Sequence, residues 1–383
     1  MTVALADPLP VAIVGGGPAG MALALALHRQ GIRCAIHDAR SRRAGADDPR
    51  VLALSHGARQ ILEWLGAWRD IPHTPIATIH VSQAGHLGRT LLTAGEHAVP
   101  ALGYVLAARD LIAALDRALE GAAVEYRENS RIDTARPGED RVEFEGSAGA
   151  GAARLLAFAE GGIAGEEARR RDYGQHAVIC RVTSREAHRN LAFERFTPAG
   201  PVALLPMGNA WALVLTCPDG DSARIAALPD AEFLALLQCR FGHRLRFEAA
   251  GPRAVFPLGL RYREAPVAAR QVWVGNAAQT LHPVAGQGFN LALRDIWQLA
   301  DSVGSAVRAA GDPGAPEVLA AYAGARRLDR RGAMGFTDVL VRVFGGGARW
   351  FGHARGAGLL ALDLVPPARD FLARRMMFGA RAW

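Results

Sequence analysis

The fold can be inferred from one short stretch near the N-terminus, Val11-Ala12-Ile13-Val14-Gly15-Gly16-Gly17-Pro18-Ala19-Gly20. Its four apolar residues predict a strand, and its glycines predict a turn that leads into a helix over Pro18–Gln30. A second strand is expected at Cys34–Asp38. Strand, glycine turn, helix and strand in this order are typical of the first half of a dinucleotide-binding α/β fold with a parallel sheet.

The glycines have the G-x-G-x-x-G spacing that accommodates a pyrophosphate. Gly15 permits the tight turn, Gly17 lets the main chain approach the phosphates, and Gly20 allows close packing of helix and sheet. Pro18 and Ala19 begin the helix, whose N-terminus favours negative charge. We expect these five residues to bind a cofactor. A glycine turn without a ligand is the alternative, and the motif alone does not distinguish FAD from NAD.

An acidic residue, Asp38, closes the second expected strand. Its carboxylate can accept hydrogen bonds from the hydroxyl groups of a ribose, and its charge disfavours a cofactor with a 2′-phosphate. Asp38 is therefore a further candidate for cofactor binding.

A second glycine-bearing stretch lies far along the chain and separates FAD from NAD. It follows a strand expected at Val272–Gly275, opens a helix expected over Asn290–Ala310, and reads Val274-Gly275-Asn276-Ala277-Ala278-Gln279-Thr280-Leu281-His282-Pro283-Val284-Ala285-Gly286-Gln287-Gly288-Phe289-Asn290. This segment resembles the second FAD signature of the p-hydroxybenzoate hydroxylase superfamily. Its residues are most similar to those of the UbiH-type hydroxylases of ubiquinone biosynthesis. An NAD enzyme has no evident need for such a segment.

The resemblance implies that this loop passes the ribityl chain and lays backbone N–H groups against the O2 edge of the flavin. A helix N-terminus in that place stabilises negative charge on the flavin. Many relatives carry Gly-Asp where this chain has Gly275-Asn276, and the amide can still bond a ribityl hydroxyl. The expected cofactor-binding residues of this segment are Gly275, Asn276, Gly286, Gly288, Phe289 and Asn290, and Pro283 and Gly286 are the candidates for the loop at the reacting face of the flavin.

Two arginines are further candidates for cofactor binding. Arg50 begins the segment Arg50–Ser55, which resembles the family segment whose arginine reaches the adenylate side of FAD. Arg109 resembles another cofactor-facing position, with a solvated arginine at the start of a helix as the alternative. The middle signature of the superfamily appears only as Ala159-Glu160-Gly161-Gly162, without its usual serine, which leaves a role for Glu160 in doubt.

The stretches 79–88 and 193–207 resemble those of hydroxylases in the ubiquinone pathway, so the likeness spans most of the chain. It implies an FAD-dependent monooxygenase that hydroxylates the ring of a polyprenylated phenol, specifically 2-polyprenyl-6-methoxyphenol, through a C4a-hydroperoxyflavin. O₂ is the second substrate, and NAD(P)H or another donor reduces the flavin. Because the cofactor performs the difficult step, diagnostic catalytic side chains are not required. His80, His86 and His282 are interpreted as structural or solvated.

The expected fold is an α/β, Rossmann-like FAD-binding domain with an inserted β-sheet substrate domain and a C-terminal helical segment. We expect the FAD-binding domain to be discontinuous, the insertion to form the substrate domain, and Glu128–Gly151 to be rich in loops. The predicted ranges are 1–75, 101–175 and 266–330 for the FAD-binding domain, 76–100 and 176–265 for the substrate domain, and 331–383 for the helical segment.

Composition restricts the protein class and its location. The formal net charge is +7, but the arginines are scattered, which argues against nucleic acid as a partner. Four widely spaced cysteines without a CxxC pair argue against a metal site and against disulfides. We expect a cytoplasmic protein. The tail Leu359–Trp383 mixes large apolar residues with arginines, which suits contact with the inner membrane or a ubiquinone-biosynthesis complex; packing on the enzyme's own core is the alternative.

Other functions remain open at this level. The hydroxylase could act at another ring position or on another aromatic substrate. The same fold serves flavin halogenases, although their Trp-x-Trp-x-Ile-Pro segment does not occur in this sequence. The weakened middle signature also allows a non-catalytic flavoprotein scaffold of a quinone-biosynthesis complex.

Overall fold

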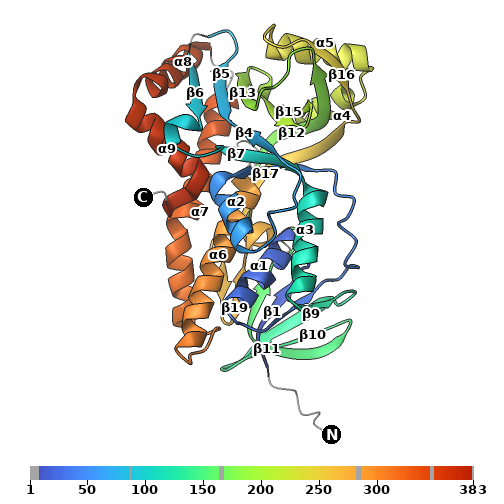
Figure 1. Ribbon diagram of the computed structural model, residues 1–383, viewed down its shortest axis with the longest axis vertical. Helices are drawn as coiled ribbons and strands as arrows, with labels where there is room; N and C mark the ends of the chain where they lie inside the picture. Colours follow the sequence, from blue (N-terminus) through green and yellow to red (C-terminus); the bar gives the residue numbers. More distant parts are fainter. Residues whose placement is uncertain (1–7, 87, 164–167, 282–286, 346–348, 382–383) are drawn as a thin grey trace.

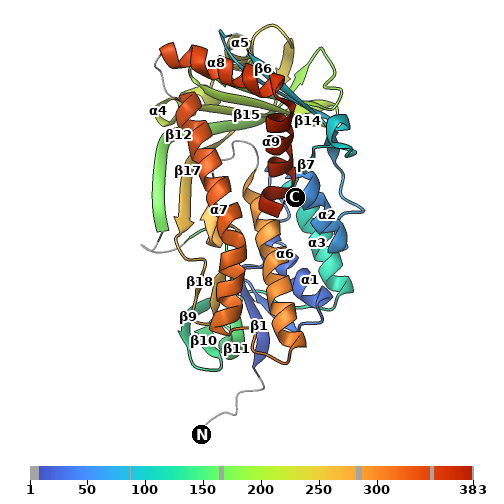
Figure 2. The same cartoon turned by 90° about the vertical axis from the view of Figure 1, so that its left-hand side faces the viewer.

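Two large β-sheets lie one above the other along the long axis of the molecule, and a long helix runs beside both (Figure 1, Figure 2). This computed structural model describes residues 8–86, 88–163, 168–281, 287–345 and 349–381. The lower sheet has eight strands, the upper sheet has nine, and a third sheet of three strands packs between them.

The lower sheet contains the predicted nucleotide-binding unit. It consists of β1 (Leu9–Val14), β2 (Cys34–His37), β8 (Glu125–Arg127), β9 (Ile132–Pro137), β10 (Val142–Gly146), β11 (Gly149–Phe158), β18 (Val267–Ala268) and β19 (Gln271–Trp273). Strands β1, β2, β11 and β19 run parallel to one another in the order β19-β11-β1-β2. The predicted parallel α/β unit is therefore present, with strand bounds within two residues of those expected.

The expectation that Glu128–Gly151 is mainly loop is wrong. Strands β9 and β10 and the start of β11 form an antiparallel meander within this segment. Val142 and Phe144 alternate with exposed glutamates and pack against Ala12 and Val14 of β1. This period of two is the pattern of a half-buried strand, and it outweighs the turn-forming glycines around it.

Four helices pack on one face of the nucleotide-binding sheet, opposite the antiparallel meander. They are α1 (Pro18–Arg29), α2 (His56–Trp64), α3 (Ala108–Gly121) and α6 (Gln287–Arg308). Helix α1 lies between α3 and α6 (Figure 1), and its residues 20–27 are all buried. A helix that is apolar on every side is stable only in such an enclosed position. The glycine turn before α1 is thereby held on a rigid core.

The upper sheet forms the wall of a second core. Its strands are β5 (Thr78–Gln83), β6 (Arg89–Thr93), β12 (Ala168–Ser184), β13 (Leu191–Thr197), β14 (Gly200–Met207), β15 (Ala210–Pro218), β16 (Phe247–Ala250), β17 (Ala254–Arg263) and β20 (Gln279–Thr280). Helices α4 (Asp219–Ala226) and α5 (Asp230–Phe241) cover one face of this sheet. On that face Phe193, Leu213 and Leu215 pack against Phe233 and Leu237 of α5.

The three-stranded sheet links the two larger ones. It is made of β3 (Val51–Ser55), β4 (Thr74–Ile76) and β7 (Gly103–Ala107). Ile76 and Val105 pack against Ala192 of the upper sheet. The alternating apolar residues over 76–82 predict one strand, but this stretch is divided between β4 and β5, which belong to different sheets. The predicted division into an FAD-binding and a substrate domain remains a prediction.

Helices complete the C-terminal part of the chain. They are α7 (Pro316–Gly345), α8 (Arg349–Leu364) and α9 (Pro366–Phe378), and the 3₁₀ turn η4 (Gly379–Arg381) follows them. Two further 3₁₀ turns, η1 (Gly95–His97) and η2 (Gly275–Ala277), lie earlier in the chain. Ala373 and Met377 of α9 are buried against Leu92 and Leu102, so α9 packs on the chain's own core. Among the described helices, none has the length and apolarity needed to span a bilayer.

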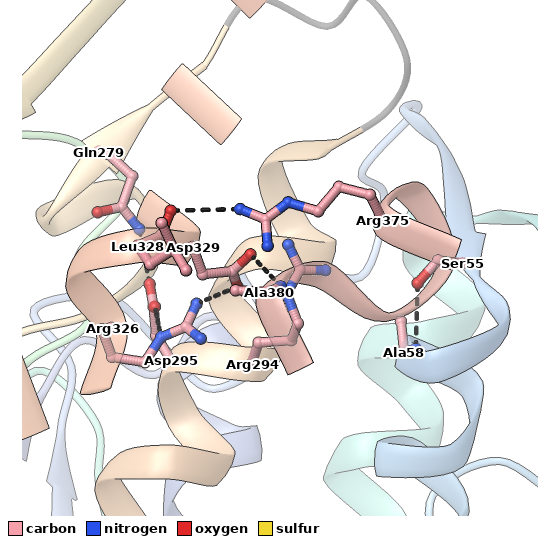
Figure 3. A network of polar contacts seen from close by, with 10 residues as sticks. All are labelled: Ser55, Ala58, Gln279, Arg294, Asp295, Arg326, Leu328, Asp329, Arg375 and Ala380. Carbon is pink, nitrogen blue, oxygen red and sulfur yellow. Dashed lines mark hydrogen bonds and ion pairs between the residues drawn. The ribbon is translucent and has the colours of Figure 1, made fainter. Parts of the chain in front are cut away.

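A buried ion network fixes α6 to α7 (Figure 3). Arg326 Nε lies 2.6 Å from Asp295 Oδ1, and its Nη2 lies 2.7 Å from Asp329 Oδ2. Arg294 Nε also bonds Asp329 Oδ2 at 2.7 Å, and the backbone N–H of Ala380 donates to the other oxygen of this carboxylate. The network ties the chain after α9 to the helix that follows the second glycine segment.

Candidate cofactor site and substrate pocket

The segments predicted to bind the cofactor follow four parallel strands that end side by side. Val14 of β1 is level with His37 of β2 and with Phe158 of β11, and Phe158 is level with Trp273 of β19. The residues after each strand therefore meet at one carboxyl edge of the sheet. This edge is where ligands bind in open α/β sheets.

The glycine turn has the geometry of a phosphate cradle. Gly15 has φ +103°, and a Cβ there would lie 3.0 Å from the backbone of Ala159. At position 20 a Cβ would collide with the carbonyl oxygen of Gly15. At Gly17, by contrast, a Cβ would meet no described atom within 4 Å, and no side chain caps the helix that begins there. The protein itself thus needs Gly15 and Gly20, whereas Gly17, with Pro18 and Ala19 after it, leaves room for a ligand.

Asp38 braces the glycine turn from the neighbouring strand. Its Oδ2 accepts a hydrogen bond from Gly16 N at 2.6 Å, and its Oδ1 accepts one from Arg40 N at 2.8 Å. Tyr126 lies over Gly16, where any side chain would collide with the tyrosine hydroxyl. The acidic residue is therefore beside the turn, as the motif predicts, and its contact with a ribose stays a prediction.

The middle segment Ala159–Gly162 lies against the glycine turn in spite of its missing serine. Ala159 N donates to Val14 O at 2.8 Å. Burial raises the pKa of Glu160, and the nearby Arg263 acts in the opposite direction. Asn276 Nδ2 donates to Gly161 O at 3.4 Å, which joins this segment to the second motif.

The second glycine segment meets the first through Gly275. This residue has φ +59°, and a Cβ at its position would lie 3.3 Å from Cβ of Ala19 and 3.4 Å from Cβ of Ala292. Only glycine fits easily both the backbone conformation and the space. The start of the second motif is thus in contact with the first turn of α1.

The rest of the second motif lies at the N-terminus of α6. A Cβ at Gly288 would meet no described atom within 4 Å, and Phe289 packs against the core of the nucleotide-binding half. Asn290 is buried, and its amide bonds the backbone of β3. Direct contacts of these three residues with the cofactor remain predictions. The flavin-face candidates Pro283 and Gly286, with His282, lie outside the described residues.

The two candidate arginines are placed differently from the glycines. Arg50 precedes β3 and forms an ion pair with Asp48, with its Nη2 2.6 Å from Asp48 Oδ2. Arg109 is in the first turn of α3, is largely exposed, and approaches Asp110 only to 3.8 Å. Neither contact decides whether these arginines reach a bound cofactor.

A small apolar pocket, open to solvent, adjoins the N-terminus of α6. Gln287 and Asn290 of α6 are at one side. The other wall residues are on β3, β4, β5, β6, β7 and α9 and just before β7: Ala53, Leu54, Ser55, Ile76, Ile79, Leu92, Leu102, Gly103, Ala373, Met376 and Met377. A concave apolar wall with a few polar groups is typical of a small-molecule site.

Sequence reasoning missed this pocket because its residues come from seven separate elements. Periodicity identifies such residues as core and does not show that a space remains between them. The contribution of α9 is the least expected, because the apolar residues of the tail predict contact with a membrane or with a protein complex. His80, by contrast, lies on the sheet face covered by α5, where burial and then Arg244 lower its pKa to about 4. It is a structural residue away from the pocket.

The residues of the carboxyl edge fit an FAD. The open space at Gly17, the uncapped start of α1 and the contact between Gly275 and Ala19 suit a dinucleotide that passes both motifs. The family model of the FAD binding domain matches residues 8–336.

The chain belongs to the FAD-binding domain family.

Relatives of known name support this membership. The chain is 35% identical to the ubiquinone hydroxylase UbiL of Rhodospirillum rubrum, over 96% of this chain and 89% of that protein. It is 30% identical to the 3-demethoxyubiquinol 3-hydroxylase of Escherichia coli, over 93% of this chain and 95% of that protein. The fold is similar to that of the p-nitrophenol 4-monooxygenase PnpA of Pseudomonas putida, with a TM-score of 0.76, 17% identity and coverage of 98% and 99% of the two chains.

These findings confirm the predicted fold and cofactor. The protein is an FAD-dependent monooxygenase of the p-hydroxybenzoate hydroxylase superfamily. The pocket and the names of the relatives both bear on the identity of its substrate.

Proposed function

We propose that this enzyme hydroxylates the aromatic ring of a polyprenylated phenol in ubiquinone biosynthesis, with 2-polyprenyl-6-methoxyphenol as the substrate. The observation that carries the proposal is the apolar pocket at the N-terminus of α6, beside the second FAD segment. A ring with a hydrocarbon tail is the chemical match to walls of leucine, isoleucine and methionine. The names of the relatives from Rhodospirillum rubrum and Escherichia coli support the same pathway.

The division of labour follows from the family chemistry. FAD, when bound and reduced by NAD(P)H or another donor, would activate O₂, one atom of which enters the ring while the other leaves as water. Gly17 and the start of α1 would hold the pyrophosphate, and Gly275 and Asn276 would bind the ribityl chain; the open space at Gly17 and the contact of Gly275 with Ala19 support these roles. The pocket walls exclude water and orient the ring.

Hydroxylation at another ring position is the second candidate. It is favoured by the 30% identity to a 3-demethoxyubiquinol 3-hydroxylase, a relative whose name specifies a different substrate. The two candidates share the fold, the cofactor and the pocket, and differ in the substrate and in the ring carbon that is hydroxylated.

Quinone profiling of a strain that lacks the gene tests the proposal. Mass spectrometry should show accumulated 2-polyprenyl-6-methoxyphenol, and the wild-type gene should restore the quinone, whereas a Gly17→Val variant should not. A different stalled intermediate would assign the enzyme to another ring position. An unchanged quinone profile would refute the proposed pathway.

We also propose that the corner between α8 and α9 contacts an anionic membrane surface from which the substrate is taken. Leu360, Leu364, Val365 and Phe371 are 46%, 69%, 47% and 51% exposed at this corner. The net charge of +7 complements anionic lipid. On its other side α9 carries Met376 and Met377, which line the pocket. Lipid and pocket would therefore be separated by one helix.

Sedimentation with vesicles tests the membrane proposal. A Leu364→Ser, Phe371→Ser double variant should bind vesicles of anionic phospholipid several-fold more weakly than the wild type, because apolar side chains no longer enter the interface. Leu328→Ser is the matched control, since Leu328 is 65% exposed on α7. Equal binding by all three proteins would overturn the proposal. Deletion of α9 is unsuitable, because it would also remove a wall of the pocket.

A further inference from the structure

Glu194, in the middle of β13, carries a carboxylate without a partner. Among the described residues, no hydrogen bond or ion pair reaches it. Its pairing partners on the neighbouring strands are Val81 of β5 and Ala203 of β14, both apolar. Burial raises the pKa of Glu194 to about 7. An acid in such surroundings lowers stability, and residues of this kind are concentrated at functional sites.

The strand register shows which way Glu194 faces. Phe193 and Arg195 point toward α5, since Phe193 packs on Phe241 and Leu237 there. Glu194 therefore points to the opposite face, together with Ala192. At Ala192 that face meets the three-stranded sheet, because Ala192 packs with Ile76 and Val105. In the row of Glu194, α8 lies on the same face at its β6 end, where Thr90 Oγ1 donates to Leu359 O at 2.7 Å.

The same face continues into the apolar pocket. Ala192 is paired with Ile79, which lines the pocket, and Glu194 is one pleat farther along, or about 7 Å. Gln83 of β5 faces the same side, and its buried Oε1 has no hydrogen-bond partner in the described part of the chain. Two side chains with unpaired oxygen acceptors are thus on the sheet face that carries Ile79, a residue of the pocket wall.

From this juxtaposition we propose that Glu194 accepts the hydrogen bond of the substrate's phenol hydroxyl and so positions the ring in the pocket. The inference rests on the proposed function, since it takes the substrate to be a phenol. Of the residues that β5, β13, β14 and β15 present to this face, Glu194 alone has an ionisable side chain. A phenol donor supplies the partner that the carboxylate lacks, and a hydrogen bond to a charged or buried acceptor discriminates strongly against a ligand without the donor.

Binding of a matched pair of ligands to the oxidised holoenzyme tests this role without turnover. The probes are a 2-prenyl-6-methoxyphenol with a short tail and its methyl ether, which cannot donate a hydrogen bond. The dissociation constants are read from the flavin absorbance. The wild type should prefer the phenol about tenfold or more. Glu194→Gln should lose part of this preference, and Glu194→Leu should bind both probes equally.

Stability separates a binding role from a structural one. If Glu194 serves substrate binding and lowers the stability of the fold, its replacement should leave the stability unchanged or raise it. Glu194→Gln and Glu194→Leu should therefore unfold at the same temperature or a higher one. Glu248→Gln, which changes an exposed carboxylate on β16 of the same sheet, is the control for both measurements.

The outcomes are distinct. If Glu194→Leu keeps the wild-type preference for the phenol, the role of Glu194 is refuted while the proposed function stands. A lower unfolding temperature of Glu194→Gln would likewise assign Glu194 to the structure. If the wild type binds neither probe, the proposed substrate class itself is refuted. Should the leucine variant fail to fold, Glu194→Gln carries the test, because it keeps the size of the side chain.

Discussion

The amide of Asn290 bonds the backbone on both sides of Leu54, accepting a hydrogen bond from Ser55 N at 2.8 Å and donating one to Ala53 O at 2.9 Å. It joins the first turn of α6 to β3, and both elements line the pocket. This one side chain therefore ties the start of the helix that follows the second FAD segment to β3.

Replacement of Asn290 by alanine should destabilise the protein by about 1–3 kcal/mol, because a buried N–H and a buried carbonyl lose their partner. FAD should also bind more weakly, since the start of α6 is no longer held. Urea unfolding of the apoprotein and fluorescence titration with FAD measure the two effects. Gln60→Ala, which alters an exposed amide on α2, should change neither, and equal behaviour of the two variants would contradict the role of Asn290.

Two glycines of the first motif should respond in opposite ways to alanine. Gly20→Ala should lower the unfolding temperature of the apoprotein, because its Cβ collides with the backbone of Gly15. Gly17→Ala should leave the apoprotein at least as stable, since its Cβ meets no described atom within 4 Å, but should weaken FAD binding. Thermal unfolding without FAD, followed by FAD titration, separates the two. Tight FAD binding by Gly17→Ala would argue against a phosphate at this turn.

The ion network between α6 and α7 should be sensitive to the loss of its central cation. Arg326→Met leaves the buried carboxylates of Asp295 and Asp329 short of a partner, and we expect a loss of about 3–5 kcal/mol in unfolding free energy. Arg327→Met, at the exposed neighbouring position, should stay within about 0.5 kcal/mol of the wild type. Denaturant titration of the two variants provides the comparison. Similar losses in both would show that the buried network contributes little.

The pocket should control the length of tail that the enzyme accepts. Met376→Trp adds bulk to the wall formed by α9 and should raise KM for a long-tailed phenol more than for a short-tailed one. FAD content should be unchanged, because α9 is remote from the glycine turn. Steady-state kinetics with two tail lengths test this expectation, and a parallel rise in both KM values would place the tail elsewhere.

Glu194 should leave a signature in the pH dependence of stability. Its pKa in the folded protein, about 7, is above the ordinary 4.5, so between these values the native state binds more protons than the unfolded state. The wild type should therefore lose stability relative to Glu194→Gln as the pH rises from about 4.5 through 7. Urea unfolding of both proteins across this range measures the difference. A difference that is independent of pH would contradict the raised pKa.

The nucleotide-binding unit could be predicted from the sequence because local patterns determine it. Apolar runs, glycine spacing and the closing Asp38 occur within a short segment, and the strand and helix bounds agree closely with the structure. Of the antiparallel meander over 132–158, only the strand at Val142–Phe144 can be predicted from its alternation, because glycines and charged residues interrupt the pattern on either side.

The pocket and Glu194 show the limit of such prediction. A strand has two faces, and the sequence of β13 does not tell which one meets α5 and which one meets the pocket. Only the pairing of β13 with β5 and β14 makes that choice. Similarly, apolar residues of α9 have the same pattern whether they face lipid, core or cavity. Long-range packing, which leaves little trace in local composition, decides these cases.

Helix α9, thirteen residues long, is a partition with the outside on one side and the pocket on the other. A lipid surface that binds the outer side and shifts the helix would change the width of the pocket behind it. By thermodynamic reciprocity, a ligand in the pocket would then change the affinity of the outer side for lipid by the same factor. A shift of this one short helix would thereby couple the binding of lipid on its outer side to the binding of a ligand in the pocket.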